Sequence, residues 1–88
     1  MKAMLCKEFG LPESLVLEEV DGLAPGPKEV LISVKACGVN FPDTLIIQGK
    51  YQYKPDLPFS PGGEVSGVVK QIGSEVSGVN VGDRVIAF

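Results

Sequence analysis

The chain has 88 residues, a formal net charge of −3, 44% hydrophobic residues and 22% charged residues, as is typical of one soluble globular domain. Its eight lysines and arginines are scattered, which argues against a nucleic-acid or anionic-membrane partner. No apolar run approaches the ~18 residues that span a bilayer, and the N-terminus lacks a long apolar core, so we expect a cytoplasmic protein.

The first part of the chain predicts three strands. Residues 2–7 are rich in apolar side chains, and residues 15–20 alternate with Leu15 and Leu17 on one face. Residues 29–37 give the clearest signal, because apolar and β-branched side chains recur along them with a period of two. Connections rich in glycine and proline separate these strands.

Residues 41–48 predict a short helix. Pro42 suits its first position, where the missing N–H would have no partner in any case. Asn40 is a suitable N-cap, and Asp43 would lie in the first turn, where the helix dipole favours a negative charge. Gly49 marks the end of the helix.

The second part of the chain returns to strand patterns. Residues 51–61 contain three prolines and predict a loop. Residues 63–72 are β-rich, and Gly67 within them predicts a bulge or a close backbone approach. Residues 83–88 predict a last strand. Five short strands, glycine-rich corners and one short helix predict a mainly β fold, a small and partly open β-barrel.

Several kinds of catalytic site are disfavoured by residue type. The chain has no histidine and only two cysteines, Cys6 and Cys37, so the usual zinc ligands and a Ser–His or Cys–His dyad are missing. We interpret both cysteines as reduced, packed thiols. No glycine-rich phosphate-binding motif opens a helix. We therefore expect no metal site, and no nucleotide binding by this chain alone.

A polar cluster around the expected helix is the remaining candidate site. Its members have side chains that donate or accept hydrogen bonds: Asn40, Asp43, Gln48, Tyr51 and Tyr53. The same residues have ordinary structural roles, because Asn and Asp cap helices and tyrosines often close a loop over a core. The residues alone leave both interpretations open.

Motifs along nearly the whole chain resemble one family. They are the opening residues 1–20, A-C-G-V-N-F-P-D-T at 36–44, L-P-F-S-P-G-G-E-V-S-G-V-V at 57–69, and V-G-D-R-V-I-A-F at 81–88. Together they resemble the N-terminal, GroES-like catalytic domain of the medium-chain dehydrogenases/reductases. Zinc alcohol dehydrogenases of that superfamily carry a cysteine after the G-V step and a G-H-E triplet. Here Asn40 and Gly62-Gly63-Glu64 occupy those positions, which resembles the zinc-independent quinone oxidoreductase (zeta-crystallin-like) branch.

The resemblance implies roles for particular residues. Asn40, Asp43 and Tyr51 would be the catalytic residues, with the first two beside the nicotinamide and Tyr51 near the quinone. Asn40 and Phe41 would contact the cofactor. Leu45 stands where several relatives have tyrosine, so the resemblance does not extend to a quinone contact at that position.

The resemblance also implies an enzyme larger than this chain. It would transfer hydride from NADPH to a quinone or another activated carbonyl or alkene, as a homodimer. The NADP cofactor would be bound mainly by a Rossmann domain absent from this chain, so residues 1–88 would be a truncated GroES-like domain, incomplete relative to the family domain and inactive alone. Two alternatives remain: a stand-alone GroES-like module for binding or assembly, and a reductase of enoyl thioesters or alkenes from the same superfamily.

Overall fold

The computed structural model describes all 88 residues and divides them into two compact units that are interleaved along the chain. The first, which we call the hairpin–helix unit, consists of Met1–Asp21 and Val39–Gly63. The second, the sheet unit, consists of Gly22–Gly38 and Glu64–Phe88. Each unit is therefore assembled from two separate segments of the chain.

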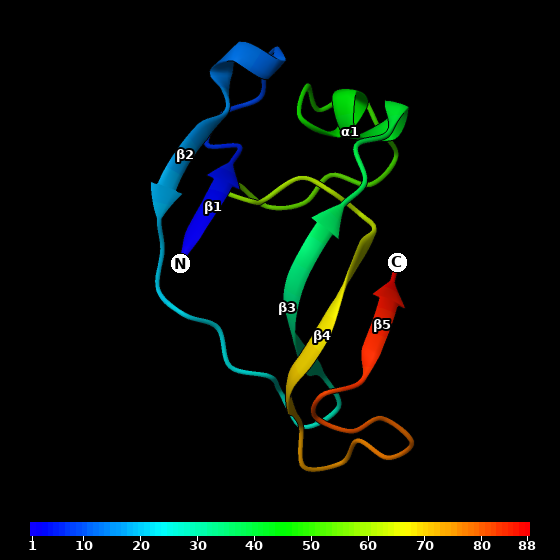
Figure 1. The fold of residues 1–88 in the computed structure, drawn as a ribbon. Helices are drawn as coiled ribbons and strands as arrows, with labels where there is room; N and C mark the ends of the chain where they lie inside the picture. Colours follow the sequence, from blue (N-terminus) through cyan, green and yellow to red (C-terminus); the bar gives the residue numbers. More distant parts are fainter. The chain divides into compact units, whose positions relative to one another are not determined.

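The hairpin–helix unit begins with a two-stranded antiparallel hairpin. Strand β1 (Lys2–Leu5) pairs with β2 (Val16–Glu19), as shown in Figure 1. A single 3-10 turn, η1 (Pro12–Ser14), lies in the connection, and the Ser14 hydroxyl donates to the Leu11 carbonyl at 2.7 Å. The sequence predicted both strands and a turn between them, but not that the turn is a short 3-10 helix.

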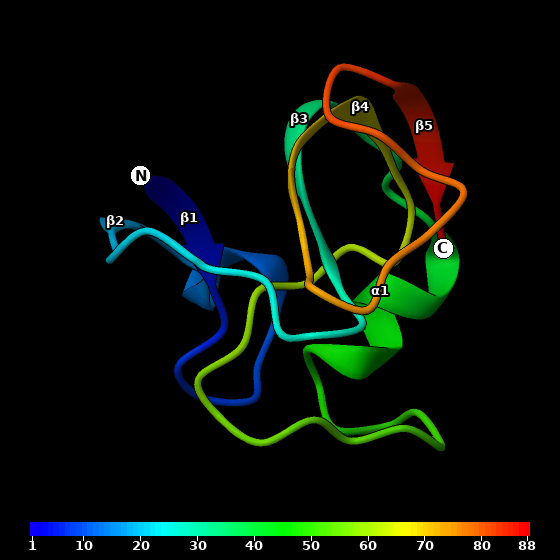
Figure 2. The ribbon, with the colours of Figure 1, turned by 90° about the horizontal axis from the view of Figure 1, so that it is seen from below.

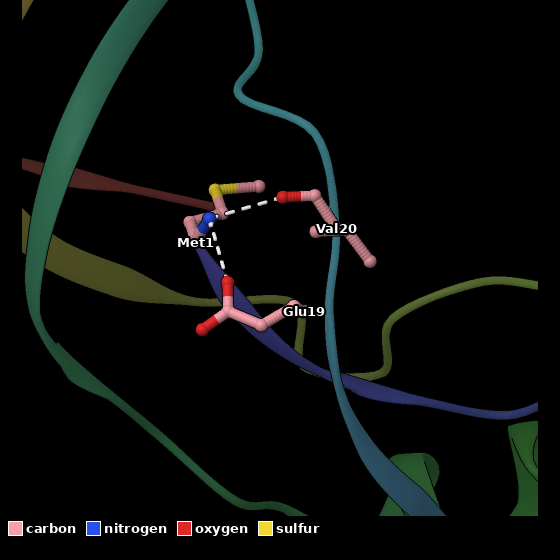
Figure 3. A network of polar contacts seen from close by, with 3 residues as sticks. All are labelled: Met1, Glu19 and Val20. Atoms are coloured by element: carbon pink, nitrogen blue, oxygen red, sulfur yellow. Dashed lines mark hydrogen bonds and ion pairs between the residues drawn. The ribbon is translucent and has the colours of Figure 1, made fainter.

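At the open end of the hairpin, the N-terminal amino group of β1's side contacts the last residues of β2's side. It donates to the Val20 carbonyl oxygen at 3.0 Å and lies 3.2 Å from a carboxylate oxygen of Glu19, as drawn in Figure 3. The Val20 N–H returns a hydrogen bond to the Met1 carbonyl at 2.8 Å. Because the ion pair is exposed, it adds little to stability, and the backbone bonds define this end of the hairpin.

Helix α1 (Phe41–Ile46) ends through a Schellman motif. The Gly49 N–H donates to the Ile46 carbonyl at 3.1 Å, and the Lys50 N–H donates to the Leu45 carbonyl at 2.9 Å. Gly49 has φ +69°, a left-handed conformation that glycine adopts without steric cost. The expected helix at 41–48 is confirmed but shorter, since its last residues form this turn.

The core of the hairpin–helix unit is built around Cys6 and Ile47, which are 0% and 3% exposed. The Gly10 N–H donates to the Ile47 carbonyl at 2.8 Å. The loop at residues 51–61 runs back from α1 towards the end of β1 (Figure 2), where Phe59 forms an antiparallel bridge with Cys6. The proline-rich loop is therefore attached to the first strand by backbone hydrogen bonds.

The sheet unit is a three-stranded antiparallel sheet. Strand β4 (Val65–Ile72) lies between β3 (Val30–Cys37) and β5 (Arg84–Ala87) in Figure 1. Val69, in the central strand, is 1% exposed and is the largest fully buried side chain of this unit. These strands confirm the patterns read at 29–37, 63–72 and 83–88.

The backbones of β3 and β4 approach closely at Gly67, next to a register shift in their pairing. The register shifts between Val34 and Ala36, and Gly67 and Ser66 are the partners of those two residues. A Cβ on Gly67 would lie 2.2 Å from the Ser33 carbonyl oxygen, so only glycine fits. The expected close approach is confirmed.

Burial along β3 does not alternate with the period of two in its sequence. Its first half is partly buried, whereas the half from Val34 to the end is exposed on both faces. The two register shifts interrupt the pleat that an alternating pattern requires. The strand is confirmed, but its expected single buried face is not.

The mainly β fold with one short helix is confirmed. The five strands form two separate sheets, β1–β2 and β3–β4–β5, so no hydrogen-bonded barrel closes. The structure contains no helix with the length and apolar character required to cross a membrane.

Candidate functional site

Asn40 and Asp43 meet at the start of α1. The Asp43 carboxylate accepts a hydrogen bond from the Asn40 backbone N–H at 2.8 Å, and the Asp43 N–H donates to the Asn40 carbonyl at 3.0 Å. The two residues form a capping box, and the Asn40 side-chain amide donates no hydrogen bond within the structure. The exposed amide of Asn40 therefore remains available to a ligand.

Phe41 presents an aromatic ring to solvent beside that amide. It is 74% exposed, and Val39 on the other side of Asn40 is 86% exposed. The Thr44 hydroxyl donates to the Phe41 carbonyl at 2.6 Å and fixes the backbone of this turn. Two large apolar side chains flanking an exposed amide are not explained by packing within the hairpin–helix unit.

The remaining members of the polar cluster have different surroundings. The Gln48 amide nitrogen donates to the Thr44 carbonyl at 2.6 Å, so this side chain serves the helix itself. Tyr51 is partly buried, whereas Tyr53 is 66% exposed. No hydrogen bond of the structure joins Tyr51 to Asn40 or Asp43. The structure thus brings together Asn40 and Asp43, with Phe41 between them in sequence.

Two open grooves lie on the sheet unit, and neither contains a predicted site residue. The first holds about 320 Å³ and the second about 700 Å³. Polar residues that line them include Lys35, Glu64, Ser66 and Arg84. Sequence reasoning missed these four as site residues, although Glu64 stands in the P-G-G-E motif. Both grooves are too open to enclose a ligand within this unit alone.

The two cysteines are free and differ in environment. Burial raises the pKa of the Cys6 thiol, and the nearby Glu8 carboxylate adds to the increase, while a hydrogen bond to the Glu8 backbone opposes it. Cys37 is exposed, so the interpretation of both as packed thiols is wrong for Cys37. Cys37 lies at the end of β3, where both faces of the strand are open to solvent. No group of three or more potential metal ligands gathers in the structure.

Comparison with protein families identifies most of the chain. The family model of the alcohol dehydrogenase GroES-like domain matches residues 26–88. Those residues include the sheet unit from β3 onward and the whole candidate site.

Individual proteins extend the match to the first residues. Quinone oxidoreductase-like protein 2 of Rattus norvegicus is 49% identical over 85 residues, covering 97% of this chain and 24% of its own. Quinone oxidoreductase of the same organism is 46% identical over 90 residues, covering 100% of this chain and 27% of its own. The crystal structure of Escherichia coli quinone oxidoreductase complexed with NADPH matches with a TM-score of 0.91 at 36% identity, covering 98% of this chain and 26% of that one. The chain spans about a quarter of the length of these relatives.

Proposed function

We propose a function from the fact that this chain belongs to the alcohol dehydrogenase GroES-like domain family, in the quinone oxidoreductase branch of the medium-chain dehydrogenases/reductases. Residues 1–88 are the substrate-side domain of an NADPH-dependent quinone oxidoreductase whose cofactor-binding domain lies outside these residues. The observation that carries the proposal is 46% identity to a quinone oxidoreductase along the entire chain.

The residue types at the zinc-ligand positions support a zinc-independent enzyme. Asn40 and Gly63 stand where the zinc enzymes carry cysteine and histidine, and neither side chain is a usual zinc ligand. A quinone is already electrophilic, so it accepts hydride without a Lewis acid to polarise its carbonyl. Positioning and hydrogen-bond donors are then what the protein must supply.

The geometry at the start of α1 supplies such groups. The Asn40 amide N–H groups, which have no partner in the structure, would donate a hydrogen bond to substrate or cofactor, and the exposed Phe41 ring would be available to pack against the cofactor. Asp43 holds the Asn40 backbone in place through its 2.8 Å hydrogen bond. Tyr51 would donate a hydrogen bond to the quinone oxygen. NADPH would supply the hydride when bound, and a single proton from solvent would complete the hydroquinone.

Membership of the quinone oxidoreductase branch also suggests a substrate class, a cofactor, a location and an oligomeric state. We propose quinones, or other activated carbonyl and alkene compounds, as the substrate class, with NADP as the cofactor. We also propose that the complete protein is a cytoplasmic homodimer.

A quinone-dependent NADPH oxidation assay on the complete protein tests the proposal. Asn40→Leu and Tyr51→Phe remove the two proposed donors, and each should lower kcat/KM for a benzoquinone by about 100-fold. Tyr53→Phe is the matched control, because Tyr53 is mostly exposed and has no assigned role. Unchanged turnover in both variants would discard these residue assignments.

The same assay decides the substrate class. If the wild-type protein oxidises NADPH with a benzoquinone, the quinone reductase proposal stands. If it is inactive with quinones but turns over an enoyl thioester, the alternative reductase replaces it.

A further inference from the structure

Every predicted site residue lies in the segment Val39–Gly63, and the two residues that flank this segment, Gly38 and Glu64, are hydrogen-bonded to each other. The chain leaves the sheet unit at Gly38 and returns to it at Glu64, and the intervening Val39–Gly63 contains Asn40, Asp43 and Tyr51. The Gly38 N–H donates to the Glu64 carbonyl at 3.0 Å. This bond extends the β3–β4 ladder beyond its last pair, where the end of β3 and the start of β4 lie side by side in Figure 1.

The side chain of Glu64 folds over Gly38. A Cβ on Gly38 would lie 2.1 Å from Oε1 of Glu64, and 2.8 Å from both Cγ and Cδ. Gly38 does not have a left-handed φ, so glycine is favoured here by the space that the Glu64 side chain occupies and not by backbone conformation. The Glu64 carboxylate forms no ion pair, so the contact is one of shape.

We propose that Glu64 is a positioning residue: by packing over Gly38 it fixes the backbone that leads into Asn40, two residues further along the chain. The inference rests on the proposed function, in which Asn40 acts on substrate or cofactor. A displaced Glu64 side chain frees this backbone segment, and small displacements of a positioning element are costly for turnover.

Gly38→Ala is a way to displace the Glu64 side chain without removing it. The contact is made by the flexible end of a side chain, so the added methyl group moves that side chain and leaves the sheet intact. Glu64→Ala removes the contact altogether, and Glu64→Gln preserves its shape. Gly63→Ala is the matched glycine control, because a Cβ there meets nothing within 4 Å.

Turnover of a benzoquinone by the complete protein is the first measurement. We expect Gly38→Ala and Glu64→Ala each to lower kcat/KM by about tenfold. The double variant should lose no more than either single variant, because both changes break the same contact. Glu64→Gln should restore most of the activity lost in Glu64→Ala. Additive losses in the double variant, or no rescue by glutamine, would overturn the proposal.

The backbone amide NMR signals of Asn40 and Asp43 are the second measurement. They should shift in Gly38→Ala and Glu64→Ala, and stay in place in Gly63→Ala and Glu64→Gln. Unmoved signals in the first two variants would overturn the positioning role even if turnover falls. If the wild-type protein reduces no quinone, the proposed function fails, while the amide signals still decide whether Glu64 orders the backbone that leads into Asn40.

Discussion

The backbones of Cys6 and Phe59 are joined by two hydrogen bonds, from the Cys6 N–H to the Phe59 carbonyl at 2.8 Å and back at 3.2 Å. This bridge brings the proline-rich loop onto the end of β1 beside Cys6, whose side chain is completely buried. The thiol of Cys6 is therefore withdrawn from solvent, whereas that of Cys37 is not.

Thiol labelling should distinguish the two cysteines. We expect a disulfide reagent at pH 8 to modify Cys37 at least about 100-fold faster than Cys6, because a buried thiol reacts only when the structure opens. Cys37→Ser should abolish the fast phase, and addition of denaturant should expose Cys6. Equal rates for both thiols in the native chain would contradict the burial of Cys6.

The raised pKa of the Cys6 thiol predicts a loss of stability in alkali. The pKa of an ordinary thiol is about 9.0 and that of the folded Cys6 thiol is higher, so the native state binds more protons between the two values. The Cys6 thiol should therefore leave the free energy of unfolding unchanged below about pH 8, and lower it as the pH rises above about 9. Urea denaturation from pH 7 to 10 measures this slope. Cys6→Ala should lower stability overall but show a shallower slope, and an unchanged slope would refute the prediction.

Replacement of Gly49 should destabilise the end of α1. Alanine at φ +69° costs about 1–2 kcal/mol, and its Cβ would also lie 3.2 Å from the Phe9 ring. Gly78→Ala is the matched control, because Gly78 has φ +83° but no neighbour within 4 Å of its Cβ. Urea denaturation should show a larger loss for Gly49→Ala than for Gly78→Ala. Equal losses would mean that the contact with Phe9 adds nothing.

Replacement of Gly67 should disrupt the three-stranded sheet. An added methyl group would overlap the Ser33 carbonyl oxygen, which belongs to the backbone and cannot move without separating β3 from β4. We expect a cost of about 3 kcal/mol or more and a loss of amide hydrogen-exchange protection in both strands. Gly22→Ala, where a Cβ meets nothing, should retain wild-type protection. Retained protection in Gly67→Ala would show that the close approach is not required.

The N-terminal turn of α1 should depend more on Asp43 than on the Asn40 side chain. Asp43→Ala removes the carboxylate that accepts from the Asn40 N–H and should cost about 1 kcal/mol. Asn40→Ala should cost less, because the Asp43 N–H keeps its hydrogen bond to the backbone carbonyl of residue 40. Denaturation midpoints of the two variants provide the comparison. A larger loss for Asn40→Ala would show that its amide belongs to the cap.

Local signals in the sequence predicted the elements well. Pro42 and Gly49 mark the start and end of α1, and the alternation in residues 29–37 marks β3, because these preferences act through the nearest neighbours along the chain. Gly67 was correctly interpreted as a close approach.

Contacts between residues far apart in the chain could not be predicted from the sequence. The packing of Glu64 over Gly38 and the bridge from Cys6 to Phe59 depend on strand register, which no local pattern specifies. The exposure of Cys37 was missed for a related reason, since the register shifts in β3 decide which of its residues are covered. At the candidate site, the capping box of Asn40 and Asp43 was predictable from spacing, whereas the absence of a partner for the Asn40 amide N–H groups was not.

The alternation of the two units along the chain has a consequence during protein synthesis. The hairpin–helix unit is not complete until Gly63 has left the ribosome, and the sheet unit waits for β5 at Arg84–Ala87. Because Gly22–Gly38 of the sheet unit is made in the middle of the hairpin–helix unit, the two units cannot emerge one after the other as uninterrupted blocks, as domains usually do. Strands β1 and β2 can pair as soon as both have emerged, whereas β3 has to wait for β4, which is made after the whole hairpin–helix unit.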